Sequence, residues 1–113
     1  MATSHPTAGA SLKVLRLPGA EAIDSVAIAR HFGTLLRHKR RLADLSQEAL
    51  GYLASLHRTE IGLLERGGRT PRIDTLVKIA GSLECGPELL LAGITWHPGS
   101  ILTKGQFYAE RRR

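Results

Sequence analysis

The sequence predicts an all-α fold, a compact bundle of five short helices in residues 24–93. A flexible N-terminal arm (residues 1–23) precedes it, and a short extension with β character (residues 94–113) follows it. Three observations predict this organisation. The length, 113 residues, suits one domain. Aromatic residues make up only 4%, so Leu, Ile, Val and Ala must build the core, which favours helix on helix. Apolar residues recur at helical spacing between clear start and stop signals.

The first helix is predicted over residues 25–42. The preceding arm is rich in Ala, Gly, Ser, Thr and Pro, which is typical of a mobile terminus. Its one alternating stretch, LKVLRL at residues 12–17, leaves a short strand as an alternative. Asp24 and Ser25 then offer an N-cap. The inward face of the helix is expected to contain Ile28, Phe32, Leu35, Leu36 and Leu42.

Two short helices joined by a tight turn follow. Ser46 is a good N-cap for the first of them, with Leu50, Leu53 and Ala54 on its apolar face. The second begins at His57, turns Ile61 and Leu64 inward and ends at Gly67 and Gly68. The small side chain of Ala54 lets the two helices approach at a steep crossing. This arrangement is a helix-turn-helix, in which the second helix projects its N-terminal end away from the core.

The remaining chain is expected to form two more helices and a β-prone tail. After a loop at Pro71, a helix turns Leu76, Ile79, Ala80 and Leu83 inward. Pro87 then opens a fifth helix, where its missing N–H is harmless, and Gly93 closes it. Residues 94–96 and 106–108 are β-prone and flank the turn signal Pro98–Gly99, which predicts a strand or hairpin. Such a hairpin needs a surface to pack on, either the helices or a second copy.

Charge and composition narrow the functional classes. The net charge is +6 and the pI is near 10.3, which suits nucleic acid or an acidic membrane surface. A single cysteine, Cys85, excludes an intramolecular disulfide and a cysteine-pair zinc site. We interpret it as a small buried residue rather than a nucleophile. No apolar run reaches the length of a membrane helix and no secretory signal is evident, so we expect a cytoplasmic protein without a membrane partner.

The sequence offers no chemistry for catalysis. We find no Ser/His/Asp arrangement, paired carboxylates or glycine-rich phosphate loop. His31 and His38 share a helix face but lie about 10 Å apart along it, too far to bind one metal. We therefore expect no catalytic residues, no metal site and no cofactor, and we predict that the chain is not an enzyme.

Residues 45–71, LSQEALGYLASLHRTEIGLLERGGRTP, resemble the Xre family of Cro and phage-repressor-like regulators. The similarity extends from about Phe32 to Leu91 and rests on Ser-Gln-Glu at the first helix, Glu-Arg-Gly at the end of the second, and Pro71 beyond. It implies a five-helix, lambda-repressor-like domain that binds double-stranded DNA. It also implies a homodimer on a pseudo-palindromic operator, with a recognition helix near residues 57–66.

The resemblance assigns roles to individual residues. Arg58, Thr59, Gly62 and Leu63 match positions that face base edges in the major groove. Arg58 is the strongest candidate, since a bidentate arginine–guanine pair discriminates by roughly 1–3 kcal/mol. Gly62 would leave its base unread or allow close backbone approach. Residues that match or suit phosphate contacts are Ser46, Gln47, His57, Arg66, Arg69 and Arg72. Arg40 and Glu65 match a family ion pair that ties the first helix to the recognition helix.

Several alternatives stay open. The run at residues 37–41 (RHKRR) is either a nucleic-acid patch or a solvated helix face, and residues 111–113 are more typical of a solvated tail. Because His57 is a weak N-cap, we expect Glu60 to reach back to that turn. Trp96 and Phe107 are either a satellite core or, as we favour, a dimer interface. The expected function is a repressor or autoregulator. The rivals are an antitoxin that masks a toxin with residues 94–113, and a non-specific nucleic-acid binder.

Overall fold

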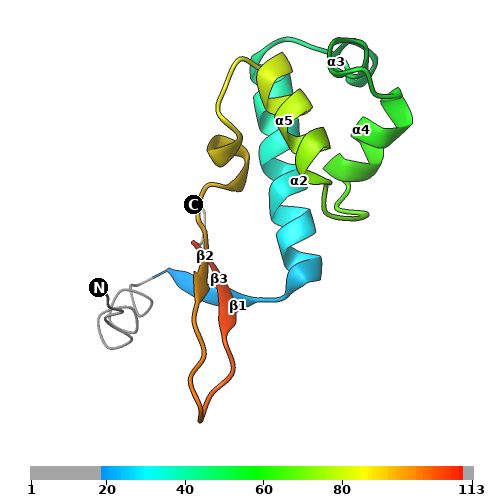
Figure 1. Cartoon of the computed structure of the whole chain (residues 1–113). Helices are drawn as coiled ribbons and strands as arrows, with labels where there is room; N and C mark the ends of the chain where they lie inside the picture. The colour runs from blue at the N-terminus through cyan, green and yellow to red at the C-terminus, as the bar shows by residue number, and fades with distance from the viewer. Residues whose placement is uncertain (1–18, 111–113) are drawn as a thin grey trace, which may run out of the picture. The chain divides into compact units, whose positions relative to one another are not determined.

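The structure is a computed structural model that describes residues 19–110, and its contacts divide this part of the chain into two compact units. One unit is helical and comprises residues 25–92; the other comprises residues 19–24 and 93–110 and contains a small sheet (Figure 1). The interpretation of residues 12–17 as a possible strand, and that of the tail at residues 111–113, lie outside the described residues.

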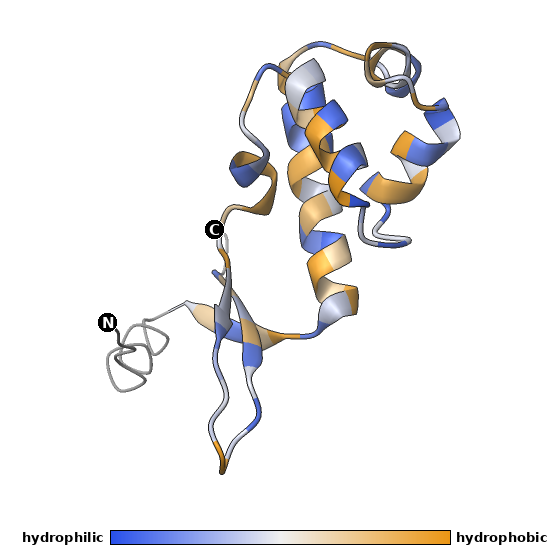
Figure 2. Ribbon diagram, viewed as in Figure 1, coloured by the Kyte–Doolittle hydropathy of each residue, from blue (hydrophilic) through white to orange (hydrophobic). Residues whose placement is uncertain are grey.

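The helical unit contains α2 (Ser25–Leu42), α3 (Gln47–Ala54), α4 (Arg58–Glu65), α5 (Ile73–Ser82) and the 3₁₀ helix η1 (Pro87–Leu91). Along α2, apolar and polar stretches alternate, as an amphipathic helix requires (Figure 2). Most residues expected to face inward do so. The core consists of Phe32, Leu36, Leu50, Ala54, Ile61, Leu64, Ile79, Ala80 and Leu90. Leu76, Leu83 and Cys85 pack against it, partly buried. Two predictions are wrong, because Leu42 and Leu53 are exposed.

The prediction of five helices in an all-α fold needs two corrections. The helical unit has four α-helices, and the segment after Pro87 forms a 3₁₀ helix of five residues instead of a fifth. Only a short segment lies between Gly86 and Gly93, and its first bond joins the N–H of Leu89 to the carbonyl of Gly86, three residues back. The second correction is the presence of a three-stranded sheet.

That sheet contains β1 (Ala20–Ile23), β2 (Ile94–His97) and β3 (Gln106–Glu110), in the antiparallel order β1-β3-β2. The β-prone pieces of the extension are therefore strands, as the sequence predicts. β1 was expected to be part of the flexible arm. Its four residues, AEAI, have little β-propensity of their own, and its pairing comes from β3, more than eighty positions later in the chain.

A close approach of α2 and α4 fixes the position of α4. A Cβ atom at Gly33 on α2 would lie 2.4 Å from the carbonyl oxygen of Leu64 and 2.6 Å from that of Glu65. Real Cβ atoms do not come this close to backbone, so the two helices meet backbone to backbone at a glycine. Nowhere in residues 19–110 is a helix long and apolar enough to cross a membrane.

Candidate nucleic-acid interface

The N-terminus of α3 is closed by Ser46, whose Oγ accepts the N–H of Ala49 at 2.9 Å. Gln47 is the first residue of the helix and Glu48 lies in its first turn. Helix N-termini carry N–H groups without intrahelical partners and a partial positive charge, which together attract anions. The sequence-predicted phosphate residues Ser46 and Gln47 therefore lie where an anion is favoured.

The turn between α3 and α4 is built from local hydrogen bonds. Ser55 adopts the left-handed conformation (φ 57°), and the N–H of Leu56 donates to the carbonyl of Gly51 at 2.8 Å. His57 then caps α4, because its Nδ1 accepts the N–H of Thr59 at 3.1 Å and lies 2.9 Å from the Thr59 hydroxyl. The orientation of the first turn of α4 is thus held by side chain and backbone together.

The expectation that Glu60 compensates for a weak cap at His57 is wrong. His57 itself satisfies the N–H of Thr59, and the Glu60 carboxylate instead forms an ion pair with Arg69 in the loop after α4. This contact ties the loop to the first half of α4. It also uses one of the arginines that the sequence assigned to phosphate.

The four predicted base-contact residues differ in accessibility. Arg58 and Thr59 are exposed on the first turn of α4, whereas Leu63 is half-buried and lies against Gly68. Gly62 is buried. A Cβ atom there would meet the Arg66 guanidinium at 3.1 Å and the Gln47 amide oxygen at 3.4 Å. The ends of these two side chains therefore lie beside this glycine.

A buried ion pair joins α2 to α4, as the resemblance implies. Arg40 donates to Glu65 through Nε at 2.5 Å and through Nη2 at 2.9 Å, and its Nη1 donates to the carbonyl of Leu45 at 2.8 Å. Gln47 adds a bond from Nε2 to Glu65 at 3.1 Å. The side chains of Arg40 and Glu65 are only 10% and 3% exposed. The network therefore links α2, the start of α3 and the end of α4.

The protonation states of this pair follow from its contacts. Its hydrogen bond to Glu65, together with the charge of that carboxylate, raises the pKa of Arg40 despite burial. Burial by itself would raise the pKa of Glu65. Hydrogen bonds from Arg40 and Gln47, with the positive charges of Arg40 and Arg37, outweigh burial and hold this pKa below its usual value. Both groups stay charged at neutral pH.

Three arginines assigned to phosphate lie at the end of α4 and beyond it. Arg66, Arg69 and Arg72 are all exposed. Arg69 pairs with Glu60, and Arg72 pairs with Asp74 through Nε and Oδ1 at 3.3 Å. Exposed pairs of this kind contribute little to stability, so a phosphate can replace the carboxylate at small cost. Within the described chain, Arg66 has no ion-pair partner.

Two further side chains of α3 are exposed: Tyr52, for which the sequence predicts no role, and Leu53, which it places on the apolar face. Tyr52 is 85% exposed on α3, and Leu53 beside it is 54% exposed. An aromatic residue at a helix position outside the apolar face was the available signal for Tyr52. Leu53 contributes to an open hollow between α3 and α5, together with Ala54, Ser55, Lys78, Gly81, Ser82 and Glu84.

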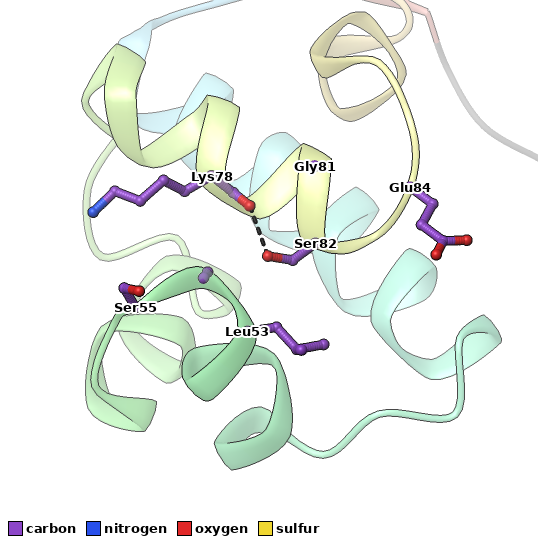
Figure 3. A pocket seen from close by; sticks show the side chains of 7 residues that line it. Leu53, Ser55, Lys78, Gly81, Ser82 and Glu84 are labelled. Carbon is purple, nitrogen blue, oxygen red and sulfur yellow. Dashed lines mark hydrogen bonds between the residues drawn. The ribbon is translucent and has the colours of Figure 1, made fainter.

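This hollow has a volume of about 470 Å³ (Figure 3). The side chains of Lys78 and Glu84 extend toward opposite ends of it, and Ser82 donates to the carbonyl of Lys78 at 2.8 Å. It brings no pair of titratable groups together. Among residues 19–110, no three His, Cys, Asp or Glu side chains form a group that could hold a metal ion.

Fold and site together define a helix-turn-helix DNA-binding module. A helix-turn-helix family model matches residues 36–90. The control protein C.SmaI of Serratia marcescens is 41% identical over 56 residues, which are 49% of this chain and 67% of that protein. The chain belongs to the Xre family of helix-turn-helix transcriptional regulators.

Two solved structures are similar to the helical unit. The restriction-modification controller protein C.AhdI from Aeromonas hydrophila aligns with a TM-score of 0.56 and 38% identity, over 57% of this chain and 97% of its own. The P22 c2 repressor, solved in complex with a synthetic operator, aligns with a TM-score of 0.52 and 29% identity, over 55% and 94%. The similarity to C.AhdI thus covers nearly all of that protein but little more than half of this one.

Proposed function

We propose that this protein is an operator-specific regulator that binds a pseudo-palindromic DNA site as a homodimer. Each protomer places α4 in the major groove of one half-site, with half-sites about 34 Å apart, one helical turn of DNA. The observation that carries the proposal is the exposed first turn of α4, with Arg58 and Thr59 projecting from a helix that a buried ion pair fixes from behind. We call this exposed first turn, with Arg58 and Thr59, the reading surface. A surface whose position is fixed before DNA binds suits base recognition.

Base readout is assigned chiefly to Arg58, which can donate two hydrogen bonds to guanine O6 and N7. The Thr59 hydroxyl already contacts His57, so its methyl group is the part free to contact a thymine methyl. Leu63 supplies an apolar edge beside them. Because Gly62 has no side chain to contact a base, part of the specificity is assigned to DNA shape.

Phosphate contacts hold this surface in register. Ser46, Gln47 and His57 lie at the two helix N-termini, and Arg66, Arg69 and Arg72 lie beyond the other end of α4. In the basic run at residues 37–41, Arg40 is buried in its pair with Glu65, which leaves the exposed Arg37, His38 and Arg41 for the DNA backbone. Such contacts position the protein and contribute most of the salt dependence.

We propose repression of the protein's own promoter by occupancy, in the cytoplasm and without a catalytic step or cofactor. The controllers and the repressor similar to this chain support that assignment. They do not favour the antitoxin alternative. Since C.AhdI is a restriction-modification controller, DNA upstream of any neighbouring restriction-modification genes is the second candidate operator.

The test is a binding titration at one fixed salt concentration, comparing DNA upstream of the protein's own gene with a scrambled duplex. A preference of about a thousandfold or more is expected for a specific operator. Arg58→Ala should lower that preference by roughly 10–100-fold while leaving the affinity for scrambled DNA nearly unchanged. Equal binding of both duplexes by the unaltered protein would overturn operator recognition at this site.

A further inference from the structure

We propose that the outer edge of β2, which pairs with no other strand among residues 19–110, pairs with β2 of a second copy of this chain, in antiparallel register centred on Thr95. The product is one continuous six-stranded sheet that holds the dimer together. The inference rests on the proposed function, since a two-fold symmetric operator needs a two-fold symmetric protein. It adds the surface and the register by which the second copy binds.

The direction of the backbone groups along β2 follows from one hydrogen bond. The N–H of Glu110 donates to the carbonyl of Gly93 at 2.9 Å, and the register then sets Ile94 against Ala109 and Thr95 against Tyr108. In an antiparallel ladder, hydrogen-bonded and non-hydrogen-bonded pairs alternate. Gly93 and Thr95 therefore bond toward β3, while the N–H and C=O groups of Ile94 and Trp96 point outward from the sheet edge.

Those outward groups are self-complementary about Thr95. A two-fold axis perpendicular to the sheet, midway between the Thr95 residues of the two copies, sets Ile94 of each copy opposite Trp96 of the other. In each of these two pairs, the N–H of either residue donates to the C=O of the other, which gives four hydrogen bonds across the axis. Centring on Trp96 would instead oppose Ile94 to Pro98, which has no N–H, and centring on Ile94 leaves only its own reciprocal pair of bonds.

Side chains favour the same register. Directly paired residues share a face of the sheet, so Ile23, Phe107 and Trp96 lie together, and Ile94, two positions before Trp96, is on the same face. The Trp96 and Phe107 rings make an edge-to-face contact with centroids 4.7 Å apart, yet Trp96 is still 54% exposed. Pairing β2 with its copy continues this apolar face across the axis and adds two Trp96–Ile94 cross-strand contacts, a favourable aromatic–β-branched combination.

The other edge of the sheet is less suited to a second copy. β1 carries Glu21, and a two-fold axis midway between the Glu21 residues of two copies would set two carboxylates directly opposite each other. β2, with the sequence ITWH, carries no Lys, Arg, Asp or Glu and no proline within its span. Charged residues and proline are the usual protection of an exposed edge, and β2 has neither.

The loop between β2 and β3 supplies the control surface. Its tip exposes Ile101 completely and Leu102 to 90%, and appears as the apolar end of the hairpin in Figure 2. Ser100 orders the tip, because its Oγ accepts the N–H groups of Leu102 and Thr103 at 3.1 and 3.2 Å. Ile101→Ser with Leu102→Ser therefore removes exposed apolar surface without altering the β2 edge.

The decisive experiment introduces a charge at Thr95, the residue that faces its own copy across the two-fold axis. Thr95 is exposed, and its partner's Cβ would lie about 5 Å away, so Thr95→Glu and Thr95→Lys each place like charges together. Each variant alone should dimerise roughly tenfold or more weakly than the unaltered full chain, by light scattering over a concentration series. An equimolar mixture of the two should recover the dimer, because Glu then faces Lys. Circular dichroism shows whether both variants are folded.

Several results would overturn the interface. They are a monomeric unaltered protein, undiminished dimerisation of either folded variant, no recovery in the mixture, or loss of the dimer in the loop-tip variant. Arg58→Ala separates this inference from the proposed function, because it should lower the operator preference by roughly 10–100-fold and leave the dimer intact. Recovery in the mixture without any operator preference would retain the interface and reject operator recognition.

Discussion

Replacing Arg40 by alanine tests the physical basis of the reading surface. The substitution removes two hydrogen bonds to Glu65 and one to the carbonyl of Leu45, and it leaves the Glu65 carboxylate buried without its cation. At 10% and 3% side-chain exposure, solvent does little to screen the pair. Breaking a buried pair by removing one partner costs about 3–5 kcal/mol.

The size of the effect on melting follows from the length of the unit. In a domain of 60–100 residues, each kcal/mol lowers the melting temperature by about 4–8 °C. A loss of about 3 kcal/mol therefore corresponds to a decrease of about 12–24 °C. Thermal unfolding followed by circular dichroism measures it, with Arg41→Ala, an exposed arginine of the same helix, as the matched control.

Operator affinity should decrease in Arg40→Ala even at temperatures where the variant is folded, because Glu65 and Gln47 lose the partner that positions them. A melting temperature within about 4 °C of that of Arg41→Ala would correspond to less than about 1 kcal/mol. That result would refute the assignment of the pair as the link between α2 and α4.

The other predictions concern neighbouring features. Glu65→Gln should be less stable than the unaltered protein, with the full difference in free energy of unfolding above about pH 4.3, the ordinary glutamate pKa. The difference should shrink as pH falls through the lowered pKa of Glu65 in the folded protein. Unfolding measured over a series of acidic pH values tests this, and a difference independent of pH would contradict the lowered pKa. Gly33→Ala should destabilise by several kcal/mol in denaturant unfolding, because its Cβ would clash with the α4 backbone, whereas Gly81→Ala has open space and should be neutral or stabilising. Ser46→Ala should cost about 1 kcal/mol in the same assay through loss of the α3 cap, and no change would mean that the cap is dispensable. Arg66→Ala should weaken binding to operator and scrambled DNA alike and reduce the salt slope by about one; a loss confined to the operator would instead indicate base contact.

Local patterns in the sequence predict most of the helical unit. Ser46 was recognised as a cap because a hydroxyl before an apolar-periodic run serves that role wherever the run is helical. The inward positions of Leu50, Ile61 and Ile79 follow from periodicity, which depends only on neighbouring residues. The pair between Arg40 and Glu65 is 25 positions apart and came from the family resemblance, not from spacing.

The features that the sequence did not predict depend on long-range contacts. Nothing within AEAI identifies β1, because its partner β3 lies at the other end of the chain. Glu60 could be assigned to the His57 turn on local grounds, but the loop that carries Arg69 folds back to it. The side chains of Gln47 and Arg66 lie beside Gly62, and no pattern of residue types specifies their conformations.

The part of the chain that matches the family model and the sheet outside it have different proposed roles, DNA binding and dimerisation. The family model matches residues 36–90, so the three strands of the sheet lie outside the part that this model describes, and little more than half of the chain suffices to cover C.AhdI almost completely. The helical unit carries the reading surface, whereas the uncharged edge of β2 offers the association surface we propose. A dimer built on that edge takes its symmetry axis from Thr95 rather than from the shared helices. Half-site spacing would then be a property of this chain's own sheet, and it has to be measured here rather than transferred from the controllers and repressors similar to it.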